Sequence, residues 1–131
     1  MKLFYATFAG VIAAFISMMF LERLGHSLFP LPFKVDPNNI GALADKLHLI
    51  PVQMYISVVV AHGLGLLIGL LIAQAIDKTS KISLYIIAGF FLIGTIANLS
   101  MIPHPMWFAV ADIAVIALVG LLMIRKPVAS N

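Results

Sequence analysis

Four apolar stretches constrain this chain most, because each is long enough to cross a lipid bilayer as an α-helix. A spanning helix needs about 20 mostly apolar residues, and four stretches meet that length: residues 3–24, 51–76, 82–102 and 106–125. Only 10% of the 131 residues are charged and 63% are apolar, so a soluble core of this size is too small to bury the apolar surface. The sequence therefore predicts an all-α integral membrane protein, a single-domain bundle of four transmembrane helices over residues 1–131.

The longest connection, residues 25–50, has a helical pattern of its own. Asp36 and Pro37 have the pattern of a helix N-cap followed by proline at the first helical position. Apolar residues then recur at spacings of three and four, which is typical of a helix with one apolar face. We expect a short amphipathic helix over about residues 37–48, lying on the membrane surface between the first two spans.

The distribution of basic residues predicts which helix ends face the cytoplasm. Five basic residues fall at one end of the bundle, namely Lys2, Lys78, Lys81, Arg125 and Lys126. Three fall at the other end, where acidic neighbours offset them, namely Arg23, Lys34 and Lys46. Basic residues are enriched in cytoplasmic loops, so we expect the N- and C-termini in the cytoplasm. Because the charge follows helix ends, we expect the lipid bilayer rather than nucleic acid as the partner.

Small residues recur every four positions on two of the expected helices. The first stripe is Ala6, Gly10 and Ala14, and the second is Ala61, Gly65, Gly69 and Ala73. Helices in a bilayer associate through close packing of small residues rather than through the hydrophobic effect. We expect both stripes to pack inside the bundle. The alternative is that one stripe forms a homodimer or a contact within a larger membrane complex.

A set of polar and aromatic residues lies toward the non-cytoplasmic end of the spans: Glu22, His26, His62, Asn98, His104, Trp107 and Asp112. Ionisable residues within a membrane are costly and usually functional. His62 lies 11 residues after Pro51, which is about 16 Å of helix. Asp112 lies eight residues after His104, about 12 Å by the same rise. Because a lone carboxylate in hydrocarbon is unfavourable, His62 is the expected partner of Asp112.

Three kinds of function are compatible with these side chains. The leading hypothesis is an outward-facing polar pocket that binds a small ligand, a lipid headgroup or a metal ion, in a non-enzymatic or accessory protein. A divalent metal would be held by Glu22, His26 and His104, although no HxxxH or HExxH pair lies on one helix. The second is a membrane-embedded enzyme that uses His and Glu as acid and base, with or without a metal. The third is a proton-coupled small transporter with His62 and Asp112 as a relay.

Two motifs carry a resemblance to a known group of proteins. They are Glu22-x2-Gly25-His26-x3-Pro30-x-Pro32 and Pro103-His104-Pro105-x-Trp107. Together they resemble a family of small four-helix membrane proteins that is widespread in bacteria and whose activity is not known. The resemblance implies a four-helix fold in the bacterial inner membrane. It also implies that the acidic, histidine and tryptophan residues of these motifs belong to the family's signature.

Overall fold

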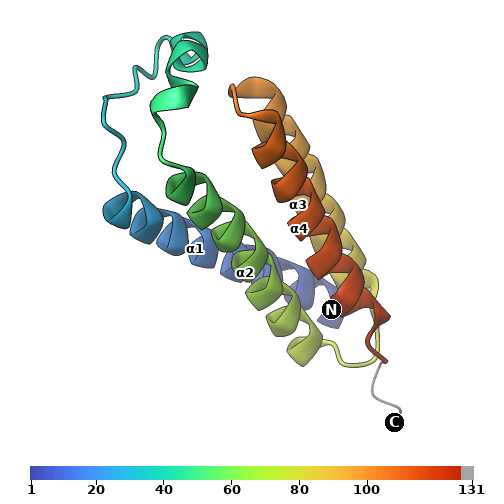
Figure 1. The fold of residues 1–131 in the computed structure, drawn as a ribbon. Helices are drawn as coiled ribbons and strands as arrows, with labels where there is room; N and C mark the ends of the chain where they lie inside the picture. Colours follow the sequence, from blue (N-terminus) through green and yellow to red (C-terminus); the bar gives the residue numbers. More distant parts are fainter. Residues whose placement is uncertain (128–131) are drawn as a thin grey trace.

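The computed structural model describes residues 1–127, which form four long helices and one short helix (Figure 1). The elements are α1 (Lys2–Leu28), η1 (Ile40–Leu49), α2 (Val52–Ile76), α3 (Ile82–Met101) and α4 (Met106–Arg125). Each of the four long helices is long and apolar enough to cross a membrane. The expected all-α bundle of four spans is therefore confirmed, and the chain is a multi-pass membrane protein.

Helix α1 extends beyond the expected end near residue 24 and reaches Leu28. The charged pair Glu22 and Arg23 does not end the helix, because the first proline after it is Pro30. The last turn is closed by the backbone N–H of Phe29, which donates to the carbonyl of Gly25 at 2.8 Å. Glu22 consequently lies about 9 Å inside the end of the helix rather than at its end.

The short helix η1 differs in its bounds from the helix expected over residues 37–48. It is a 3-10 helix, Ile40–Leu49, and it begins three residues later. The expected cap, Asp36, instead closes a turn, since its carboxylate accepts the backbone N–H of Asn38 at 2.9 Å. Asn39 caps the helix in its place by accepting a backbone N–H of the first turn at 3.3 Å. η1 makes no close backbone contact with any of the four long helices.

Helices α1 and α2 form the most extensive contact between any two helices. Every member of both small-residue stripes is buried: the first stripe is Ala6, Gly10 and Ala14, and the second is Ala61, Gly65, Gly69 and Ala73. A methyl group on Gly10 would lie 2.8 Å from the carbonyl oxygen of Gly69, and one on Gly69 would overlap the carbonyl oxygen of Gly10. The prediction that the stripes pack inside the bundle is confirmed.

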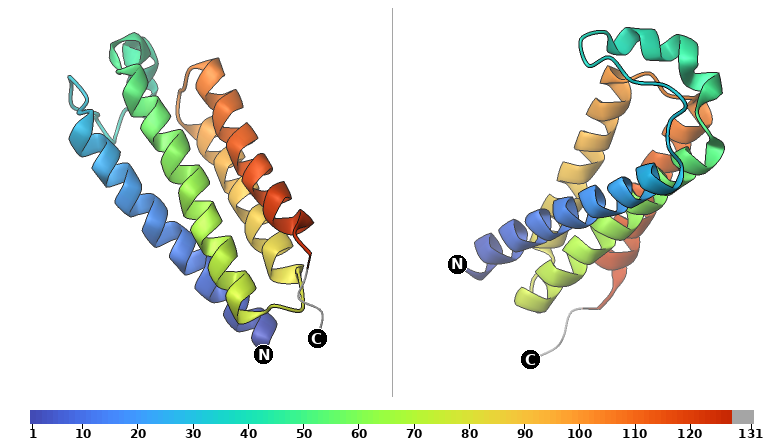
Figure 2. Two further views of the ribbon diagram at one scale, coloured as in Figure 1. Left: turned by 60° about the horizontal axis from the view of Figure 1, so that its bottom comes forward. Right: turned by 90° about the vertical axis from the view of Figure 1, so that its left-hand side faces the viewer.

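The helices form two pairs, α1 with α2 and α3 with α4, which diverge toward the end that carries η1 (Figures 1 and 2). The pairs converge at the opposite end, where the 77–81 turn and the start of α1 lie. There Lys81 Nζ donates to the carbonyl of Ile124 at 2.6 Å and links the start of α3 to the end of α4. Fully buried apolar side chains fill the bundle toward this end: Leu66, Leu70, Leu84, Ile87, Ile116 and Met123.

Candidate functional site

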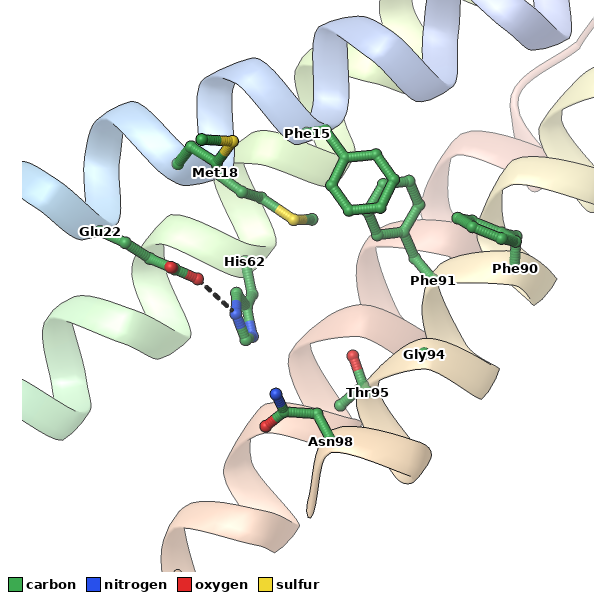
Figure 3. A pocket seen from close by; sticks show the side chains of 10 residues that line it. Phe15, Met18, Glu22, His62, Phe90, Phe91, Gly94, Thr95 and Asn98 are labelled. Atoms are coloured by element: carbon green, nitrogen blue, oxygen red, sulfur yellow. Dashed lines mark hydrogen bonds and ion pairs between the residues drawn. The ribbon is translucent and has the colours of Figure 1, made fainter. Parts of the chain in front are cut away.

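His62 connects two carboxylates that come from two other helices. Its Nδ1 lies 2.7 Å from Oδ1 of Asp112 on α4, and its Nε2 lies 2.9 Å from Oε1 of Glu22 on α1. The second contact is drawn in Figure 3. Helices α1 and α4 make no close backbone contact with each other. The imidazole on α2 is therefore the link between them, and we call these three residues the triad.

Exposure increases along the triad from one carboxylate to the other. The side chain of Asp112 is 2% exposed, that of His62 is 18% exposed and that of Glu22 is 36% exposed. The buried carboxylate is hydrogen-bonded rather than left alone in hydrocarbon, where its desolvation would be most costly. The pairing of His62 with Asp112 expected from their depths is present. A continuous chain of hydrogen bonds thus runs from the interior to Glu22.

Glycines beside the triad allow the three helices to approach closely enough for these contacts. Gly63 follows His62 on α2, and a methyl group there would lie 3.0 Å from Val115 on α4. Gly25 lies one turn beyond Glu22 on α1, and a methyl group there would lie 2.9 Å from the Cβ of Ser57 on α2. Larger residues at either position would separate the helices that carry the triad.

A cavity of about 320 Å³ lies where the helix pairs diverge, and η1 and the segment before it contribute to its lining. We call it the end cavity. Its polar lining residues are Glu22, His26, Tyr55, His62, Asn98 and His104. Five of the seven predicted site residues therefore meet around one space, and the other two are Asp112 and Trp107. Asp112 lies behind His62, to which it is bonded.

A second cavity, of about 300 Å³, lies between α1 and α3 (Figure 3). We call it the side cavity. Its lining is mainly apolar and aromatic, including Phe15, Phe90 and Phe91. The rings of Phe15 and Phe91 meet across the two helices with centroids 5.0 Å apart. The side cavity shares Glu22, His62 and Asn98 with the end cavity, so the two spaces adjoin at the triad.

His104 lies in the connection between α3 and α4 and is held in one orientation. Its Nδ1 donates to the carbonyl oxygen of Ile102 at 2.7 Å, and its ring stacks on Phe108 with centroids 4.9 Å apart. Burial lowers the pKa of His104 below its ordinary value, and the hydrogen bond to Ile102 and the charge of Asp112 oppose this shift. A neutral imidazole that donates through Nδ1 keeps Nε2 as a hydrogen-bond acceptor.

Tyr55 is a lining residue that sequence reasoning missed. Its side chain is 6% exposed, and its hydroxyl has no hydrogen-bond partner within residues 1–127. Buried hydroxyls normally have a partner, so this group is an exception beside the end cavity, which Tyr55 lines. Tyr55 and His62 are seven positions apart, which places them on one face of α2. That spacing is the signal by which the sequence could have identified Tyr55.

The remaining predicted site residues are placed differently. Trp107 lines neither cavity, and its ring packs edge-on against Tyr55 with centroids 5.5 Å apart. His26 lines the end cavity, but its side chain is exposed. Glu22 bonds to His62 rather than joining His26 and His104 as a metal-binding set. Within the described residues, no three His, Asp or Glu side chains are grouped as a metal site requires.

The bonding of His62 limits the chemistry of the triad. A histidine that activates a nucleophile needs one ring nitrogen directed at that nucleophile. Both nitrogens of His62 contact carboxylate oxygens instead. The arrangement is suited to holding charge and protons beside a cavity.

Comparison with known proteins adds no assignment to this geometry. No family model, no curated protein and no solved structure matches the chain. The triad and its two cavities are therefore the observations from which a function is proposed.

Proposed function

We propose that this protein binds a small amphipathic ligand in the end cavity, with the triad as the polar anchor, and that it does so as a non-enzymatic or accessory membrane protein. One observation carries the proposal: a hydrogen-bonded chain of three ionisable side chains leads from a buried carboxylate to Glu22 at the cavity. Ionisable groups held in a membrane interior usually serve a ligand or proton pathway. A purely structural His–Asp pair would not require the third residue.

The proposed orientation places the end cavity on the non-cytoplasmic side of a bacterial inner membrane. The basic residues Lys78 and Lys81 lie in the turn at the opposite end of the bundle, which supports cytoplasmic termini. Large apolar side chains of α1 are exposed on the bundle surface, including Phe4, Phe8 and Phe20. Their exposure supports the lipid bilayer as the surroundings of α1.

The proposal is tested by native mass spectrometry of protein purified in a mild nonionic detergent. We expect the wild type to retain a small-molecule adduct, and Glu22→Gln and His104→Ala to lose it. The Asp45→Asn variant is the matched control, because Asp45 is an exposed acid on η1 and should leave the adduct in place. Helix content and the unfolding midpoint are measured for every variant. If both cavity variants unfold, or if both keep the adduct, the proposed binding function is wrong.

A second candidate function, proton-coupled transport, is favoured by the position of Glu22. This carboxylate lies well inside α1 and is bonded to His62, and His62 is bonded to Asp112. Such a chain offers successive sites for a proton. In proteoliposomes with an entrapped pH dye, we expect Asp112→Asn to reduce proton entry at least tenfold relative to the wild type. Equal proton entry in the two proteins would exclude this function.

A further inference from the structure

The hydrogen bonds of the triad account for two of its protons. Each of the two contacts of His62 joins a ring nitrogen to a carboxylate oxygen and therefore holds one proton. Two carboxylates and a fully deprotonated imidazole carry three negative charges, and the two protons offset two of them. With no further proton on the free oxygens of Glu22 and Asp112, one negative charge remains wherever the two protons lie along the bonds.

No ion pair with a lysine or arginine offsets this charge in the described part of the chain. Within residues 1–127, the only ion pairs are the two contacts of His62 itself. Arg23, the nearest basic residue along the chain, has an exposed side chain and makes no ion pair there. An uncompensated charge is costly in a medium of low dielectric constant. A cation beside Glu22 would remove that cost.

The polar groups around the end cavity suit a cation that donates hydrogen bonds. The Nε2 of His104 is an acceptor, because the Nδ1 of that ring donates to Ile102. The amide oxygen of Asn98 is a further acceptor in the lining. A protonated amine has the charge and the donors that these groups would accept.

The side cavity provides room for a hydrocarbon chain attached to the amine. It adjoins the triad, and its lining between α1 and α3 includes Met18, Phe90 and Phe91 (Figure 3). Phe90 and Met19 at this cavity are also exposed on the surface of the bundle. A chain in this position would therefore have access to the surrounding lipid.

We propose that the ligand is a single-chain amphipath with an ammonium group, which binds beside Glu22 while its hydrocarbon chain lies in the side cavity. This inference rests on the proposed binding function and specifies the class of its ligand. Charge complementarity selects the ammonium group, and the adjoining apolar space selects the chain.

The charge requirement is tested with three probes of equal chain length in maltoside micelles: dodecylammonium, dodecanol and dodecanoate. Binding is followed by the fluorescence of Trp107, the only tryptophan, which packs against Tyr55 at the end cavity. We expect dodecylammonium to bind saturably and at least tenfold more tightly than the other two probes. Glu22→Gln should weaken dodecylammonium at least tenfold. The exposed control Asp45→Asn should bind it as the wild type does.

The position of the chain is tested with two glycines of α3 that differ in location. A methyl group on Gly94 or Gly89 would meet nothing within 4 Å, so both positions face open space. Only Gly94 lines the side cavity. We expect Gly94→Leu to weaken dodecylammonium at least tenfold and to leave butylammonium unchanged. Gly89→Leu should change neither affinity. These variants keep the test informative if Glu22→Gln fails to fold.

The possible failures are distinguishable. If dodecanoate binds as tightly as dodecylammonium, the charge inference is wrong, while a cavity that binds amphipaths remains. If Gly94→Leu has no effect on dodecylammonium, the chain does not lie in the side cavity. If dodecylammonium does not bind saturably, the ammonium proposal is overturned, whatever adduct the native mass spectra contain. The proposed function itself is refuted only by the native mass spectra, if both cavity variants unfold or both keep the adduct.

Discussion

His62 and Asp112 are 50 positions apart in the chain, and their side chains meet at 2.7 Å between Nδ1 and Oδ1. This contact joins α2 to α4 at a point where the carboxylate is almost wholly buried. The opposite nitrogen of the same ring bonds to Glu22 on α1. One imidazole therefore couples the packing of three helices to the charge at the edge of a cavity.

Removal of either partner should destabilise the bundle, and the two losses should not add. We expect Asp112→Ala to lower the free energy of unfolding by about 2 kcal/mol, because it leaves His62 without one of its partners. A double-mutant cycle with His62→Ala should give a coupling energy of about 1–3 kcal/mol. Unfolding is followed by circular dichroism in mixed micelles. The exposed control Asp45→Ala should change the stability by less than about 0.5 kcal/mol. Strict additivity would show that the two side chains do not interact.

Replacing glycine by alanine should have opposite effects on stability at Gly69, which lies in the contact of α1 with α2, and at Gly89 on α3, which lies outside it. Gly69→Ala should lower the free energy of unfolding by about 1–3 kcal/mol, because its methyl group would lie 2.7 Å from the Cβ of Ala14. Gly89→Ala adds the same methyl group where nothing lies within 4 Å. It should raise the stability by up to about 1 kcal/mol through helix propensity. Thermal unfolding of both variants in one detergent provides the measurement, and equal midpoints would contradict the stripe packing.

The half-buried imidazole of His104 should make stability depend on pH. Burial holds its pKa below the ordinary value of about 6.5, so the unfolded chain takes up a proton at higher pH than the folded protein does. Its contribution is fully present above about pH 6.5 and is lost as the pH falls below that value. The unfolding free energy is compared at about pH 7.5 and about pH 5.5. The fall in unfolding free energy between the two pH values should be smaller in His104→Gln than in the wild type. An equal fall in both proteins would show that His104 does not cause the pH dependence.

The proposed orientation can be tested with single cysteines, because the chain contains none. Asp45→Cys places a thiol on η1, and Thr79→Cys places one in the turn at the other end of the bundle. With basic residues on the cytoplasmic side, a membrane-impermeant maleimide should label Asp45→Cys in intact spheroplasts. Thr79→Cys should react only after the membrane is permeabilised. The reverse pattern would place the end cavity in the cytoplasm.

Hydropathy alone was sufficient to predict the four spans, because only a long apolar run can satisfy the bilayer. The end of α1 was harder to locate. The charges of Glu22 and Arg23 resemble a helix terminus, whereas the helix continues until the chain approaches Pro30. Before η1, two residues three positions apart, Asp36 and Asn39, are both of a type that caps helices. Asp36 is used in a turn, so the cap falls to Asn39.

Depth along the membrane could be predicted for the site, and helix rotation could not. Counting residues from the helix ends matched His62 with Asp112. The bond from Glu22 depends on which face α1 presents to α2, and that face is set by the contact of two small-residue stripes. The lack of a hydrogen-bond partner for the Tyr55 hydroxyl within residues 1–127 is likewise a result of packing. No pattern in one sequence reports it.

The most direct test of the three-helix triad is nitrogen-15 NMR of the histidine side chains in nonionic detergent, with His62 assigned by comparison with His62→Asn. Both ring nitrogens of His62 should show the shifts of groups that share protons with carboxylates. The Nδ1 signal should move in Asp112→Asn, and the Nε2 signal should move in Glu22→Gln. A His62 spectrum that is unchanged by both substitutions would contradict the triad and the proposals that depend on it.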